Sequence, residues 1–103
     1  MPITLTTPYD PGDADTTTYA QVEVTGLREN KQAKFFRFYC EYGNTVGSEF
    51  VPGVVGYQQF VAQHADYNTI KATVSTYMEP GYTCLYRGIY QWLIDKGYYA
   101  GTY

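Results

Sequence analysis

The residue types that most often carry catalysis are few in this sequence and stand apart from one another. The single histidine, His64, lies in a predicted loop, and a general base or metal ligand would need partners there. No serine or cysteine stands in a nucleophile motif such as GxSxG, and the glycines form no phosphate-binding motif. The acidic residues show no pair at a spacing typical of glycoside hydrolysis. The sequence therefore predicts no enzymatic activity, no catalytic residue and no cofactor.

Three aspartates near the N-terminus, Asp10, Asp13 and Asp15, supply the oxygen ligands that Ca²⁺ prefers. An EF-hand loop starting at Asp13 needs Gly at its sixth position and Glu at its twelfth, but Thr18 and Val24 stand there. We therefore expect solvated turn residues and no metal site, and leave open a looser cation site.

The first 18 residues are expected to form an extended N-terminal arm, and residues 19–103 a single α+β domain. Ile3 and Leu5 alternate with threonines, which predicts a short strand, and prolines punctuate the segment after it. This strand could add to a sheet edge of another subunit, which would make Ile3 and Leu5 interface residues. The alternative is that it pairs within its own domain.

Aromatic residues make up 18% of the chain, and 13 residues are Tyr, a side chain that suits half-buried positions and interfaces. The alternation in residues 34–42 places Phe35 and Tyr39 on the mixed face of a strand. Exposed aromatic patches mark binding sites. The patch could also include three tail residues, Tyr98, Tyr99 and Tyr103. The alternative is that the C-terminal helix covers this face.

Two alternating stretches predict an antiparallel hairpin over residues 19–42, with the polar segment LRENKQA as its loop. A turn is expected at residues 43–44, then an extended piece over residues 49–51 that ends at Pro52-Gly53. A less regular strand over residues 56–62 has Tyr57 and Val61 on one side and Phe60 on the other.

Two helices are expected toward the C-terminus. Asp66 is a candidate N-cap for a short helix over residues 67–76. The second helix follows residues 80–81, with Thr83 as the expected N-cap and Gly97 as the C-terminal cap. The predicted core consists of Val22, Val24, Phe36, Phe38, Cys40, Leu85, Ile89, Trp92 and Leu93.

The patterns together predict an α+β fold, a small antiparallel sheet of about four strands with a C-terminal α-helix packed on one face. The net charge of −3 argues against a nucleic-acid partner, and the sequence has no apolar run long enough to cross a membrane. The two cysteines, Cys40 and Cys84, are expected to be reduced in a cytosol, although one bridge between a strand and a helix is left open.

Charge is unevenly distributed along the chain. The first 27 residues contain acidic side chains and no basic ones, whereas residues 28–37 are strongly basic. The default interpretation is solvated surface charge. The opposite signs could also complement each other within the domain or in a neighbouring copy.

Several short segments carry a family resemblance. They are the opening ITLTTP, residues 20–25, residues 47–53, residues 85–93, Gly97 and residues 100–102. In these segments, which cover most of the chain, the sequence resembles small structural proteins of tailed bacteriophages.

The resemblance implies a non-enzymatic virion component of the tail, neck or capsid surface, made in the bacterial cytoplasm and present in many copies. Its partners would be itself and other virion proteins, with no nucleic acid and no membrane. The family has no catalytic residues to carry over, and the richness in Tyr and Phe departs from its pattern. An alternative function is a ligand- or carbohydrate-binding module that uses exposed Tyr and Phe side chains.

Overall fold

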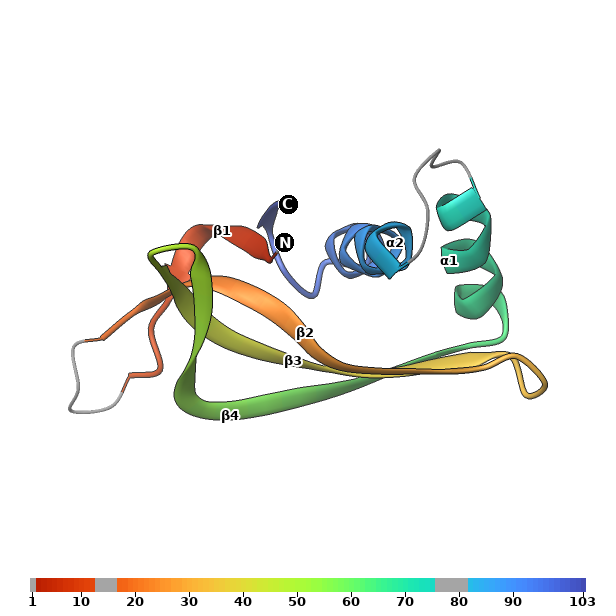
Figure 1. The fold of residues 1–103 in the computed structure, drawn as a ribbon, viewed down its shortest axis with the longest axis horizontal. Coiled ribbons are helices and arrows are strands. Elements are labelled where there is room, and N and C mark those ends of the chain that lie inside the picture. Colours follow the sequence, from red (N-terminus) through yellow and green to blue (C-terminus); the bar gives the residue numbers. More distant parts are fainter. Residues whose placement is uncertain (1, 13–16, 76–81) are drawn as a thin grey trace.

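The chain forms one antiparallel sheet that carries both helices on the same face (Figure 1). The computed structural model describes residues 2–12, 17–75 and 82–103. The strands are β1 (Ile3–Tyr9), β2 (Tyr19–Asn30), β3 (Phe35–Val46), β4 (Glu49–Gln63) and β5 (Gly101–Thr102), and the helices are α1 (Ala65–Ser75) and α2 (Tyr82–Asp95). The strand order is β4-β3-β2-β1-β5. The α+β class is confirmed, and α1 corresponds to the short helix expected over residues 67–76. The described residues form a sheet of five strands, where the sequence predicts about four.

β2 and β3 form the hairpin that the alternation predicts, but β2 runs further than expected. Only residues 31–34 form the loop, so the segment LRENKQA is mostly strand. The register shifts between Val24 and Gly26, which is a β-bulge. Val24 faces the core before the bulge, whereas Leu27 and Glu29 lie on the core side after it. The bulge therefore interrupts the alternation of core and solvent-facing residues along β2, so a strict period of two does not continue past Val24.

β4 is one strand of 15 residues where the sequence predicts two pieces. The turn predicted at residues 43–44 is wrong, because β3 continues past it and the chain reverses at Gly47, whose φ is 66°. Pairing continues through Pro52, with an irregularity beside Gly43. A Cβ on Gly43 would lie 2.3 Å from the carbonyl oxygen of Val51, so only glycine allows this approach.

The core lies between the sheet and the two helices. Phe38 of β3 meets Trp92 of α2 edge-on, with ring centroids 5.9 Å apart. All predicted core residues are buried except Leu85, which is half-buried against the core. The core residues that the sequence did not predict are Ile3, Tyr19, Ala62, Tyr67, Ile70, Tyr90 and Tyr99.

Both ends of the chain are built into the sheet. β1 pairs with β2 on one side and with β5 on the other, so it is an inner strand and not a free arm. The Thr6 amide, in addition, donates a hydrogen bond to the Ala100 carbonyl at 2.9 Å. Ile3 is fully buried, and Leu5 packs against the core. The alternative in which the first strand pairs within its own domain is therefore the one observed.

The helix ends agree only in part with the sequence. Gly97, with φ of 80°, ends α2 as predicted, because the amides of Gly97 and Tyr98 donate to the carbonyls of Ile94 and Leu93. Asp66 is not an N-cap, since α1 begins at residue 65. Thr83 likewise lies inside α2, and the predicted start at residues 80–81 lies outside the described residues.

Asp66 instead ties the two helices together. Its Oδ1 accepts a hydrogen bond from Trp92 Nε1 at 3.3 Å and lies 3.1 Å from Lys96 Nζ. The hydrogen bond from Lys96 lowers the pKa of Asp66 and outweighs the opposite effect of burial, and the bond from Trp92 and the charge of Lys96 lower the pKa further.

Glu29 ties the β2–β3 hairpin to α1. Its Oε2 accepts a hydrogen bond from the Tyr67 hydroxyl at 2.7 Å and from Lys71 Nζ at 3.1 Å. Burial acts to raise the pKa of Glu29, but the hydrogen bonds from Tyr67 and Lys71 outweigh it, and the pKa is lower than usual.

We expect Glu29→Gln to lower the free energy of unfolding at pH 7 by about 1–2 kcal/mol, because charged hydrogen bonds are lost. A carboxyl group with a lowered folded-state pKa stabilises the fold fully above its ordinary pKa of 4.5, and this stability is lost as the pH falls through the folded-state value. The difference between wild type and variant should therefore shrink below pH 4.5. Urea unfolding at a series of pH values measures it, with the exposed Glu49→Gln as control. A difference that stays constant down to about pH 3 would contradict the assignment.

Candidate interaction surface

The sheet face opposite the helices is uncovered across β2, β3 and β4 (Figure 1). Side chains alternate along a strand, so the residues between the core positions point to this face. Paired residues of the three strands form four rows across it. The rows are Glu23–Glu41–Tyr57, Gly26–Tyr39–Gln59, Arg28–Arg37–Val61 and Asn30–Phe35–Gln63. We call these residues the open face.

Like charges lie directly opposite each other on the open face. Arg28 pairs with Arg37 toward the hairpin loop, and Glu23 pairs with Glu41 at the other end. Directly opposed like charges destabilise a sheet. Within the described part of the chain, none of the four makes an ion pair. The Arg37 guanidinium lies over the Phe35 ring, 5.9 Å from its centroid.

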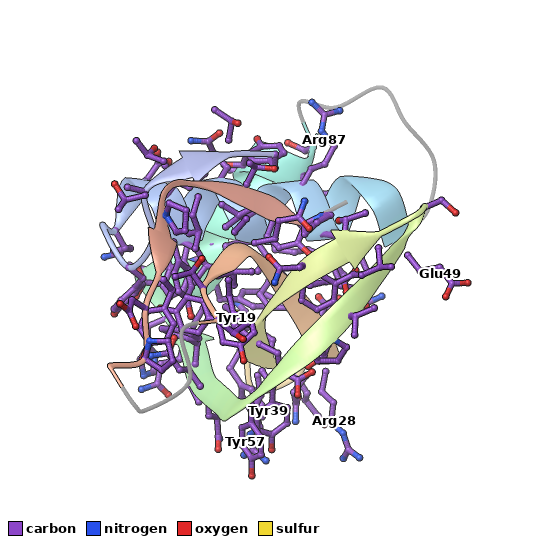
Figure 2. All side chains as sticks on the ribbon, turned by 90° about the vertical axis from the view of Figure 1, so that its left-hand side faces the viewer. Tyr19, Arg28, Tyr39, Glu49, Tyr57 and Arg87 are labelled. Carbon is purple, nitrogen blue, oxygen red and sulfur yellow. The ribbon has the colours of Figure 1, made fainter. Side chains whose placement is uncertain are left out.

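Tyr39 lies between the two charged pairs, and Tyr57 lies beside Glu41 in the glutamate row. Their rings meet edge-on, with centroids 4.9 Å apart, and Tyr57 is 66% exposed. A Cβ on Gly26 would lie 3.0 Å from the Tyr39 ring, so the glycine beside the bulge leaves room for that ring. Figure 2 shows Tyr39, Tyr57 and Arg28 projecting from the same side of the molecule.

Shallow hollows lie along the open face on both sides of Tyr39. One of about 430 Å³ is lined by Gly26, Leu27, Arg28, Arg37 and Tyr39. Another of about 340 Å³ is lined by Thr25, Tyr39, Glu41 and Tyr57. The open face therefore combines surface relief, exposed aromatic rings and separated charges.

The hypothesis that the tail tyrosines join Phe35 and Tyr39 is wrong, because they lie on the helix side of the sheet. Tyr99 is 6% exposed, in contact with the Phe60 ring. Tyr98 also packs on Phe60, and the Tyr103 hydroxyl donates to Gln91 of α2 at 2.9 Å. The alternative that the C-terminal helix covers Phe35 and Tyr39 is wrong too, since α2 covers the opposite face.

The tail contributes instead to a third hollow, of about 360 Å³, beside β1. It is lined by residues 5–10, Tyr42 and residues 98–100, among them Leu5, Tyr98 and Tyr99. Two of its lining residues, Tyr9 and Tyr42, stack on each other, with ring centroids 3.9 Å apart. Asp10 is its one acidic side chain, and the carboxylate accepts a hydrogen bond from the Gly12 amide at 2.9 Å.

Sequence reasoning found part of the open face and missed the rest. The sequence predicts that Phe35 and Tyr39 share one face of a strand and that Tyr57 and Val61 lie on one side of another, and the register confirms both. The opposed pairs were missed, because only the register of β2 against β3 brings Arg28 to Arg37 and Glu23 to Glu41. The segregation of acidic and basic residues along the chain was the available signal.

The residues considered for chemistry lie apart. His64 is exposed at the start of α1 with φ of 56°, and the described residues bring no three His, Cys, Asp or Glu side chains together. Cys40 is a free thiol whose pKa burial raises to about 12. Asp13 and Asp15 lie outside the described residues, as does the side chain of Cys84. Neither described helix combines the length and apolar character needed to cross a membrane.

Comparisons with protein-family models, with curated proteins and with solved structures found no match to this chain.

Proposed function

We propose that this chain is a non-enzymatic structural protein of a tailed bacteriophage, assembled in multiple copies in the tail, neck or capsid surface of the virion. The open face carries the assembly part of the proposal. It exposes the apolar surface of Tyr57 and Val61 and holds two like-charge pairs that nothing in the described chain neutralises. Another protein surface packed on the open face would remove this apolar area from water and could place opposite charges beside the two like-charge pairs. The virion part rests on the resemblance in the segments quoted above.

Light scattering over a range of protein concentrations tests the proposal. We expect the wild-type mass to rise above that of a single chain, and Val61→Asp to stay a single chain with an unchanged circular dichroism spectrum. Val61 is 45% exposed on the open face, so a charge there should block association without disturbing the core. Val46→Asp, at a 65% exposed site beyond the open face, is the matched control and should associate as wild type does. A wild-type chain that remains single at millimolar concentration would contradict assembly.

A carbohydrate-binding module is the second candidate. The exposed Tyr57 ring lies beside Glu41 and Thr25 around one hollow, an arrangement in which a sugar could stack on the ring and bond to the carboxylate. A glycan array separates this candidate from assembly. Binding that is lost in Tyr57→Ala, Phe35→Ala or Tyr39→Ala would favour it, and an array without any bound glycan removes it.

A further inference from the structure

We propose that the partner of the open face is a second copy of this chain, related by a two-fold axis that crosses the strands at the level of Tyr39. This inference rests on the proposed assembly function and names its partner and geometry.

The first argument is that one chain cannot neutralise its own open face. Arg37 and Glu41 are four residues apart on β3, which places their rows roughly 13 Å from each other along the strand. The Debye length at physiological salt is about 8 Å, so the two rows are largely screened from each other. Each like-charge pair therefore needs a neutralising surface from outside the chain.

The second argument is that a two-fold axis across the strands supplies that surface at both ends. Tyr39 lies midway between the arginine row and the glutamate row. A two-fold rotation about an axis at its level places each strand over the same strand of the partner, with its direction reversed. The arginine row of one chain then lies over the glutamate row of the other. Arg28 then faces the partner's Glu23, and Arg37 faces the partner's Glu41. A two-fold axis along the strands would place arginine over arginine and glutamate over glutamate. The charge pattern therefore favours the axis across the strands.

The third argument is that the same rotation pairs the exposed apolar side chains. Tyr57 lies in the glutamate row of β4 and Val61 in the arginine row, so Tyr57 faces the partner's Val61 and the reverse. They are 66% and 45% exposed in the single chain. Tyr39 would meet the partner's Tyr39 beside the hollow that Gly26 leaves. Sheets pack face to face about 10 Å apart, which suits side chains of this size.

The fourth argument concerns the other occupants. A polyanion or polycation would match one charged row and be repelled by the other, because the open face carries both signs in equal number. The face is complementary to itself, as the same patch on both subunits of a two-fold dimer must be. A second copy is therefore the partner that satisfies both rows at once.

Three charge variants test the geometry by sedimentation at low and high salt. The acidic-face variant carries Arg28→Glu with Arg37→Glu, and the basic-face variant carries Glu23→Arg with Glu41→Arg. The reversed variant carries all four substitutions. We expect each of the first two to self-associate on the order of 100-fold more weakly than wild type, because four attractive contacts become repulsive.

Mixing separates the two-fold arrangement from a general effect of charge. An equimolar mixture of the acidic-face and basic-face variants should form a heterodimer, since all four charged contacts are then attractive. This mixture tests whether the open face pairs with another open face, and the reversed variant tests the direction of the axis. The reversed variant should associate with itself but not with wild type. Circular dichroism checks that each variant is folded. If the acidic-face or the basic-face variant fails to fold, the reversed variant still tests the axis; if the reversed variant fails, the exchange of Arg37→Glu with Glu41→Arg on β3 alone makes the same test.

The outcomes distinguish this inference from the proposed function. If wild type associates and the acidic-face and basic-face variants associate equally well, assembly stands but the open face is not the interface. If both variants dissociate and their mixture does not associate, the open face does not pair with a second open face. If the reversed variant associates with wild type, the axis does not cross the strands, because an axis across the strands would bring like charges together in that pair. A wild-type chain that never associates overturns both proposals.

Discussion

Replacing Ile3 by Ala is expected to lower the free energy of unfolding by about 2–5 kcal/mol, the range for truncating a buried aliphatic side chain to Ala. Ile3 is fully buried in the core cluster and pairs with Val22 of β2. A Cβ added to Gly101 of β5 would lie only 3.0 Å from Cγ2 of Ile3. The first and last strands therefore pack tightly against each other. Urea unfolding followed by circular dichroism measures the loss.

The exposed Thr6→Ala on the same strand is the matched control, and it should change the free energy of unfolding by less than about 0.5 kcal/mol. Deleting residues 1–8 should prevent cooperative folding, because β5 would lose its partner strand and the core would lose Ile3. If the shortened chain still unfolds cooperatively, or Ile3→Ala is as stable as wild type, β1 is a dispensable arm after all.

The parts of the fold that sequence reasoning predicted are those encoded by local periodicity. The alternation around Phe36, Phe38 and Cys40 identifies one buried face without knowledge of its partners. The helical spacing of Ile89 and Trp92 does the same for α2. These residues are buried in the structure as expected.

The parts that were missed depend on pairing between distant segments. Pro52 suggested the end of a strand, but β4 is at the edge of the sheet, where a residue without an amide hydrogen is tolerated. The bulge beside Thr25 shifts the alternation by one residue, so Leu27 and Glu29 resembled loop residues. The burial of Ile3 follows from the pairing of β1 between β2 and β5, which the sequence of β1 alone does not encode.

The candidate site shows the same limit. Tyrosines suit buried, half-buried and exposed positions alike, so the sequence could not separate the open-face Tyr39 from the core Tyr99. The two lie on opposite faces because Tyr39 is an odd-face residue of β3, whereas Tyr99 reaches the core side from the loop between α2 and β5.

Tyr99→Ala is expected to cost about 3–5 kcal/mol of unfolding free energy, as for other buried aromatic side chains. The Tyr99 ring lies 5.9 Å from that of Tyr42 and 6.0 Å from that of Phe60, and its hydroxyl bonds to Gln58. Burial raises the pKa of Tyr99, and the nearby Cys40 and Tyr42 raise it further, so the hydroxyl stays protonated as a donor. Tyr99→Phe keeps the ring and should cost only about 1 kcal/mol.

Tyr98→Ala is the control for Tyr99→Ala. It shows whether the loss of stability comes from burial of the Tyr99 ring in the core or from removal of any aromatic ring in this segment. Tyr98 is 53% exposed, although its ring lies 4.9 Å from that of Phe60, so its loss should cost about 1 kcal/mol. Equal losses for Tyr98→Ala and Tyr99→Ala would contradict the placement of Tyr99 in the core. A large loss for Tyr99 alone, together with the loss for Ile3→Ala, would establish both chain ends as core elements. The open face of β2, β3 and β4 would then be the aromatic surface left for a partner.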